Sequence, residues 1–185
     1  MSTLTICNAD NGKQLEHLND HRAISDKLEI MGIQFELWSS DKPLAADAGQ
    51  DEVLEVYADD IERLSQQYGF QFVDVVALRP DHPQKAEFRQ KFFDEHTHAD
   101  FEIRFFVDGS GLFYLHVGDK VMLLMCEKGD LISVPANTTH WFDMGADPDF
   151  KCIRFFTTEN GWEGNFTGED IARHFPDFDQ YRAQM

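Results

Sequence analysis

The sequence predicts a mostly β protein, in which helices in the N-terminal third accompany one antiparallel β-barrel or sandwich. Two observations lead to this prediction: short apolar runs alternate with turn residues from about residue 96 onward, and an amphipathic helical pattern precedes them. The 185 residues are enough for one domain with a sizeable core. We therefore expect a single domain, with a helical or mixed part over residues 1–93 that packs on a barrel core over residues 94–165.

The N-terminal part carries one strong helical signal. Over residues 51–68, apolar side chains recur three or four positions apart with charged residues between them, which predicts an amphipathic helix that Gly69 ends. The aromatic and β-branched run 70–78 predicts a strand. After a proline-containing break at 79–83, residues 84–93 predict a short helix.

The barrel part is predicted as a series of short strands separated by Gly and Asp turns. The apolar runs that we expect to be strands are 101–107, 112–117, 121–126, 131–135, 140–144 and 150–156. Gly109 and Gly129 lie between such runs, where tight strand turns favour a positive φ. Regularly spaced strands of this kind are typical of an antiparallel sandwich or barrel.

The composition limits the classes of partner. The net charge of −18 repels phosphate backbones and anionic lipids, so we expect no nucleic-acid or membrane partner. No apolar run approaches the ~20 residues of a membrane helix, and the first residues lack a secretory pattern. Cys7, Cys126 and Cys152 have no disulfide spacing, which indicates a reducing compartment; we expect a cytoplasmic protein in which Cys126 and Cys152 are buried.

A metal site is the main chemical signal. Alternate residues of an extended chain share a face. The residues that share parity in this segment are His96, His98, Glu102 and Arg104. Imidazole and carboxylate ligands suit iron, nickel, manganese or zinc, and His140 would complete the set from a distant strand. A His-x-His pair also occurs by chance, and a lone histidine is more often structural, but the wider spacing favours a metal site.

That spacing resembles the two signature motifs of the cupin superfamily, whose fold is a small jelly-roll β-barrel with the metal inside. The first motif reads H-x-H-x3-E-x6-G over 96–109, and the second reads G-x5-P-x-N-x2-H over 129–140. The superfamily usually has Gly where this chain has Asn137, and Asn where it has Met144. Asn tolerates the left-handed conformation, and neither departure removes a ligand.

Within the superfamily, the chain resembles the acireductone dioxygenase family. The resemblance rests on three segments: HTHADFEIRFFVDGSGLFYLHVGD, GDLISVPANTTHWFDMG and FKCIRFF. It implies one Fe²⁺ or Ni²⁺ per chain on His96, His98, Glu102 and His140. It also implies cleavage of 1,2-dihydroxy-3-keto-5-methylthiopentene by O2 in methionine salvage. The family's products are formate and 2-keto-4-methylthiobutyrate with iron, or formate, carbon monoxide and methylthiopropionate with nickel.

Coordination chemistry agrees with such a substrate. Four protein ligands leave two adjacent positions of a six-coordinate ion open, and an enediol ketone can chelate through two neighbouring oxygens. The same ligand set leaves open another metal cupin enzyme, such as a different dioxygenase or a sugar isomerase. A non-enzymatic cupin sensor is a further alternative. Sensors of this kind usually carry a basic helix-turn-helix, which this acidic chain does not show. We expect a monomer.

Other polar and aromatic residues are candidates for substrate contact. Arg104 is expected to stabilise the enolate charge, the alternative being an ion pair with an acidic neighbour, for which Asp100 is a candidate. Arg154 lies between apolar residues, which favours a role in the pocket. Ordinary core is the commoner role for aromatic residues such as Phe106, Phe142 and Trp162. Phe106 and Phe142 share parity with Arg104 and His140, however, so one of them could enclose a methylthio group. The histidines expected at the surface are His17, His21, His82 and His174.

Overall fold

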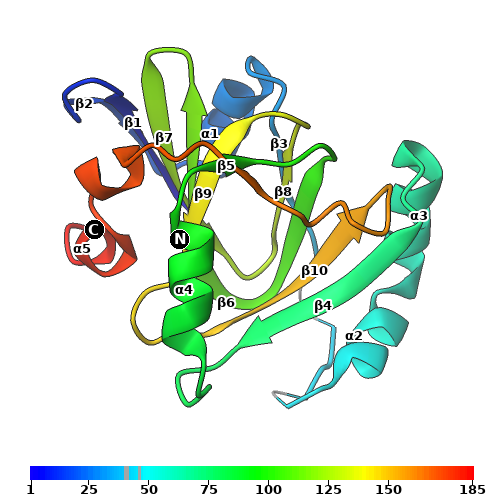
Figure 1. Ribbon diagram of the computed structural model, residues 1–185. Coiled ribbons are helices and arrows are strands. Elements are labelled where there is room, and N and C mark those ends of the chain that lie inside the picture. Colours follow the sequence, from blue (N-terminus) through cyan, green and yellow to red (C-terminus); the bar gives the residue numbers. More distant parts are fainter. Residues whose placement is uncertain (40–41, 46) are drawn as a thin grey trace.

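An antiparallel barrel forms the centre of the molecule, and helices lie on its outside (Figure 1). The computed structural model describes residues 1–39, 42–45 and 47–185. The described strands are β1 Thr3–Asn8, β2 Gln14–Leu18, β3 Gln34–Leu37, β4 Phe72–Leu78, β5 His96–Thr97, β6 Glu102–Val117, β7 Lys120–Glu127, β8 Asp130–Val134, β9 Thr139–Asp143, β10 Phe150–Phe156 and β11 Asn165–Phe166. The described helices are α1 His21–Glu29, α2 Gln50–Val56, α3 Ala58–Tyr68, α4 Lys85–Phe93, the 3-10 helix η1 Ile171–His174 and α5 Phe178–Arg182. The antiparallel β architecture predicted from the sequence is confirmed.

The long strand β6 joins the two sheets of the barrel. Its first half pairs with β8 and β10, and its second half pairs with β7 and β9. One sheet therefore runs in the order β11-β5-β9-β6-β7-β1-β2, and the other contains β4, β10, β6, β8 and β3. Because one strand belongs to both sheets, the barrel closes along it and encloses an apolar interior.

The predicted turn at Gly109 is wrong, since the expected strands 101–107 and 112–117 are one continuous strand. Gly109 does have a positive φ of 73°, but it lies within β6 opposite Phe150 of β10, two residues after the bulge at Val107 where the register against β10 shifts. A Cβ atom there would lie 1.9 Å from the carbonyl oxygen of Asp149. Glycine is therefore required by the close approach of two strands rather than by a hairpin.

The N-terminal part contributes more strand than the sequence predicts. β1 pairs with β7, β3 pairs with β8 and β4 pairs with β10, so residues before 94 extend both sheets. β1 is buried along nearly its whole length, and Thr3, Leu4, Thr5 and Ile6 alternate polar and apolar side chains, a short strand pattern that the prediction of a helical or mixed N-terminal part does not include. The strand expected over 70–78 and the short helix expected over 84–93 are confirmed as β4 and α4.

The helix expected over 51–68 is two helices, α2 and α3, separated at Tyr57. Gly69 ends the second with φ 76°, as predicted. Val53, Tyr57 and Leu64 bury the apolar face against Phe105 and other outward-facing residues of β6 and β10. In Figure 1 these helices lie beside β4 and β10, opposite α5.

The interior of the barrel is an apolar core. The interior is filled with aromatic and aliphatic side chains, among them Phe106, Phe113 and Phe142. The three cysteines are free, and all are buried, as expected for Cys126 and Cys152. Among the described residues, no helix is long and apolar enough to span a membrane.

Candidate metal centre and its cavity

Four potential metal ligands converge at one end of the barrel interior. They come from three strands and a loop: His96 from β5, His98 after it, Glu102 from the start of β6 and His140 from β9. One ligand atom from each lies within 4.8 Å of the others. All four are buried, at 2% to 8% exposure. The convergence follows from the strand pairing, since His96 is the direct cross-strand partner of His140.

The backbone orients all three imidazoles toward a common centre. Nδ1 of His96 is 2.7 Å from the carbonyl oxygen of Asp94, and Nδ1 of His140 is 2.7 Å from that of Thr138. Nδ1 of His98 is 2.8 Å from the carbonyl oxygen of Glu163. A carbonyl oxygen only accepts, so each Nδ1 carries the proton and each neutral ring presents the Nε2 lone pair. This tautomer is the one that binds a metal through Nε2.

The carboxylate of Glu102 completes the donor set. Its Oε2 lies 2.5 Å from Nε2 of His140 and 3.4 Å from Nε2 of His98. When each Nδ1 carries the proton, the Nε2 atoms and the carboxylate oxygen all present lone pairs to one another. A cation bound between them satisfies all of these lone pairs. Three imidazole nitrogens and one carboxylate oxygen are donors that suit a divalent first-row metal. The residues present therefore fit such an ion.

Electrostatics keep Glu102 ionised and His96 neutral. Burial raises the pKa of Glu102, but the charge of Arg104 and the contact with His140 outweigh burial and hold it well below its usual range. Burial, followed by the nearby His140, lowers the pKa of His96 to about 4. Burial also opposes charge on His98, but the adjacent Glu102 carboxylate favours the charged form and raises the pKa of His98. A neutral His96 and an ionised Glu102 are the forms that ligate metals.

Arg104 is held directly beside the ligand group. Its Nη2 donates to Oε1 of Glu102 at 2.6 Å, and Arg104 as a whole is 5% exposed. The guanidinium carbon lies 4.6 Å from the ring centroid of Phe142 and 5.2 Å from that of Phe113. The buried Nε has no hydrogen-bond partner among the described residues. The guanidinium of Arg104 therefore has donor capacity that Glu102 does not use, and Arg104 lines the cavity in which an anionic ligand would bind.

Arg104 does form an ion pair with an acidic neighbour, but its partner is Glu102 and not the candidate Asp100. Asp100 is buried and accepts hydrogen bonds from the backbone N–H groups of Thr157 and Thr158, at 2.6 and 3.1 Å. It therefore anchors the chain that follows β10. The segment that follows β10 is therefore held at two points: Thr157 donates to Asp100, and the carbonyl oxygen of Glu163 accepts from the ligand His98.

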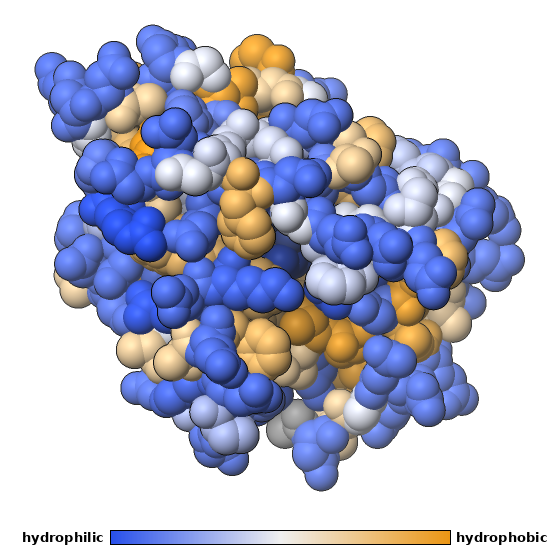
Figure 2. Space-filling view, in the orientation of Figure 1, coloured by the Kyte–Doolittle hydropathy of each residue, from blue (hydrophilic) through white to orange (hydrophobic). Residues whose placement is uncertain are grey.

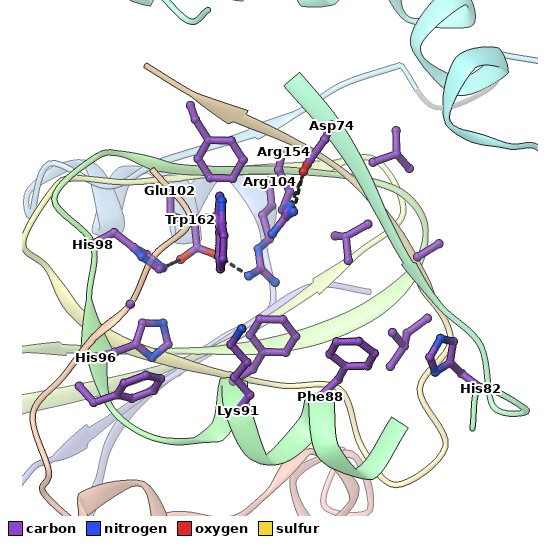
Figure 3. A pocket seen from close by; sticks show the side chains of 18 residues that line it. Asp74, His82, Phe88, Lys91, His96, His98, Glu102, Arg104, Arg154 and Trp162 are labelled. Carbon is purple, nitrogen blue, oxygen red and sulfur yellow. Dashed lines mark hydrogen bonds and ion pairs between the residues drawn. The ribbon is translucent and has the colours of Figure 1, made fainter. Parts of the chain in front are cut away.

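A cavity of about 540 Å³ opens over the ligand group. It runs between α4, β4, β10 and the segment around Trp162, as Figure 3 shows. One end is polar and contains His96, His98, Glu102 and Arg104. The other end, toward Phe88 and His82 in Figure 3, is more apolar, and Val76 and Leu78 also line the cavity. Phe92 lies between the two ends, with its ring centroid 5.7 Å from the guanidinium carbon of Arg104. Figure 2 shows this face of the molecule. A hollow lies close to its centre, with hydrophobic side chains beside it.

Arg154 lines the same cavity, as the sequence predicts. It is the direct cross-strand partner of Arg104, and it makes two hydrogen bonds to Asp74 of β4, at 2.8 and 2.6 Å. The carboxylate of Asp74 holds the guanidinium from one side, and Figure 3 shows the pair beside Arg104. Two guanidinium groups therefore lie on neighbouring strands of one wall, each fixed by its own carboxylate.

Four other residues lie at positions that differ from those expected from the sequence. Phe106 and Phe142 do face the barrel interior, but they are 0% and 1% exposed and are not among the residues that line the cavity. Phe142 instead lies under Arg104. The expectation that Trp162 belongs to the core is wrong, because this residue is 46% exposed and lines the cavity. His82, expected at the surface, lines its apolar end.

Sequence reasoning missed Asp74 and the cavity face of α4. Phe88, Lys91 and Phe92 of that helix line the cavity, and none of its residues is fully buried. An apolar stripe is the usual signal of a helix face, and a half-exposed cavity wall does not produce one. Asp74, a charged residue within an apolar strand, was a usable signal, since such a residue is costly unless it has a partner.

Comparisons with known proteins agree with this geometry. The family model described as ARD/ARD' family matches residues 4–164. An acireductone dioxygenase from Methylococcus capsulatus is 51% identical over 98% of this chain and 97% of that protein. One from Aquifex aeolicus is 49% identical over 97% of this chain and 98% of that protein. A solved structure of the Bacillus anthracis acireductone dioxygenase, with a cadmium ion in its active centre, is similar with a TM-score of 0.79 at 28% identity, over 90% of this chain and 99% of that chain.

Proposed function

Because the chain belongs to the ARD/ARD′ family, we propose that it is an acireductone dioxygenase that acts in methionine salvage. Its substrate would be 1,2-dihydroxy-3-keto-5-methylthiopentene, cleaved by O2. With iron the products would be formate and 2-keto-4-methylthiobutyrate, and with nickel they would be formate, carbon monoxide and methylthiopropionate. The observation that carries the proposal is the convergence of three imidazoles and one carboxylate, beside a buried arginine, at the polar end of one cavity.

The ligand group would hold one iron(II) or nickel(II) ion per chain. Imidazole and carboxylate donors suit both metals, so the donor set favours neither. The ion, when bound, supplies a Lewis-acidic centre with two further positions for neighbouring substrate oxygens. All four ligands come from one chain, so a single chain carries a complete site, in agreement with the monomer that we expect.

Arg104 would bind the negative charge of the enediolate. Its guanidinium is fixed by Glu102 and the phenylalanine rings beneath it, so little reorganisation is needed when the substrate arrives. Arg154 lies on the neighbouring strand and would orient the same oxygenated end of the substrate. Asp74 keeps it in that orientation.

The apolar end of the cavity would receive the methylthio group. A thioether is polarisable and packs well against aromatic rings, which Phe88 and Phe92 provide. Val76 and Leu78 form the opposite wall and exclude water from this end. The chemical difference between the two ends of the cavity would therefore fix the direction in which the substrate binds.

Alanine substitution of a ligand tests the proposal. Metal-loaded wild-type protein should consume O2 with the acireductone, and His96→Ala or His140→Ala should lower this rate by about three orders of magnitude or more, because the metal is lost. His174→Ala is the matched control, because this histidine is 62% exposed and lies away from the cavity. Detection of carbon monoxide in the nickel form and of the keto acid in the iron form would identify the products. Full activity in a ligand variant, or no turnover by the loaded wild type, would contradict the proposal.

A further inference from the structure

The overall charge of the chain opposes capture of its proposed substrate. The net charge is −18, and an enediol conjugated to a ketone loses a proton readily, so the substrate approaches as an anion. Like charges slow such an approach, and the effect reaches as far as the Debye length of the solution. Positive charge at the cavity therefore favours capture, and besides the proposed metal ion it must come from basic side chains.

Among the described residues, three basic side chains other than histidine line the cavity: Lys91, Arg104 and Arg154. The charges of Arg104 and Arg154 are largely balanced by Glu102 and Asp74. Lys91 differs from them, because no described carboxylate forms an ion pair with it. The other basic residues of α4 are paired, Lys85 with Asp147 and Arg89 with Asp143.

Lys91 stands at the exposed side of the polar end. Its side chain rises from α4 toward the cavity, between His96 and Phe88 and below Trp162 in the view of Figure 3. The ammonium lies 5.3 Å from the centre of the Trp162 ring, and Lys91 is an exposed residue. An ammonium over an aromatic face keeps its charge and is held in place by the ring quadrupole. The position is therefore one that an entering anion meets before it reaches Arg104.

We propose that Lys91 captures the anionic substrate at the mouth of the cavity and guides it to the ligand group. This inference rests on the proposed function, but it concerns the rate of substrate entry and not the bond-breaking step. Lys91 acts through its charge and is not a metal ligand. It should therefore affect kcat/KM, which reports capture, and leave kcat nearly unchanged.

The experiment compares Lys91→Gln, Lys91→Arg and Lys85→Gln as metal-loaded proteins, with O2 consumption measured over a range of acireductone concentrations. Each protein is assayed at an ionic strength of about 0.01 M, where the Debye length is roughly 30 Å, and at about 1 M, where it is roughly 3 Å. Lys85→Gln removes the same charge from the same helix at a position outside the cavity, and it is the matched control.

At low ionic strength, Lys91→Gln should lower kcat/KM about three- to tenfold, and the ratio to wild type should return to within about twofold at high ionic strength. Lys91→Arg should have a kcat/KM similar to that of the wild type at both ionic strengths, and Lys85→Gln should change kcat/KM by less than about twofold. An equal loss at both ionic strengths would mean that Lys91 only supports Trp162, and no loss would mean that the charge is not used; either result overturns the inference. Failure of loaded wild-type protein to turn over acireductone would instead overturn the proposed function.

Discussion

Replacing Arg104 by methionine removes a buried cation from the wall beside the ligand group. The guanidinium is 5% exposed and donates to Glu102 at 2.6 Å, so its interactions are little screened by water. A hydrogen bond to a charged group contributes about 1.5–3 kcal/mol, which corresponds to roughly 10- to 150-fold in rate. A preorganised donor in a dry site reaches about 10²–10³-fold in kcat. We therefore expect kcat/KM with acireductone to fall by about 10²–10³-fold.

Methionine approximates the length of the arginine stem and packs against the rings of Phe113 and Phe142, so the fold should be kept. Arg104→Lys keeps the charge but loses the planar fork, and it should fall between the wild type and Arg104→Met. O2 consumption is measured at known metal content per chain, since Glu102 loses a partner in the variant. If Arg104→Met carries a full complement of metal and retains kcat/KM within about threefold of wild type, the role of this residue is refuted.

Two further predictions concern stability and reactivity. Gly109→Ala should lower the free energy of unfolding by about 2 kcal/mol or more, because its Cβ would meet a carbonyl oxygen at 1.9 Å. Gly118→Ala, with a similar φ and open space, should cost only about 1 kcal/mol, and equal shifts of the urea midpoint would contradict this account. Burial raises the pKa of Cys126 well above its usual range and that of Cys152 to about 12, so both thiols should react with a thiol reagent only as the protein unfolds. Since unfolding returns these pKa values to 9.0, stability should fall as the pH rises from about 9 toward 12, and rapid labelling of the native protein at pH 8 would refute the prediction.

The ligand group was predictable because it depends on strand geometry alone. His96 and His98 alternate along an extended chain, and Glu102 and Arg104 continue the same parity into β6. The sheet then brings His140 opposite His96 through ordinary antiparallel pairing. Such local rules can be read from one sequence because they involve short separations and a fixed period of two.

The shape of the cavity was not predictable by the same rules. The position of Trp162 depends on the anchoring of the chain after β10 at Asp100, a contact between residues 57 positions apart. Phe106 has the correct parity for the cavity but lies deeper in the barrel, since parity gives the face and not the depth. The requirement for glycine at position 109 likewise arises from the close approach of β10 and not from a local turn sequence.

X-ray absorption spectroscopy of the nickel- or iron-loaded protein tests the metal centre most directly. The geometry predicts one ion per chain with three imidazole ligands, oxygen donors in the remaining positions and no sulfur, at distances of roughly 2.0–2.2 Å. In His140→Ala, the imidazole scattering should correspond to two rings, or the ion should be absent. A cysteine sulfur in the coordination shell, or an unchanged spectrum in this variant, would contradict the assignment of His96, His98, Glu102 and His140 as the metal ligands.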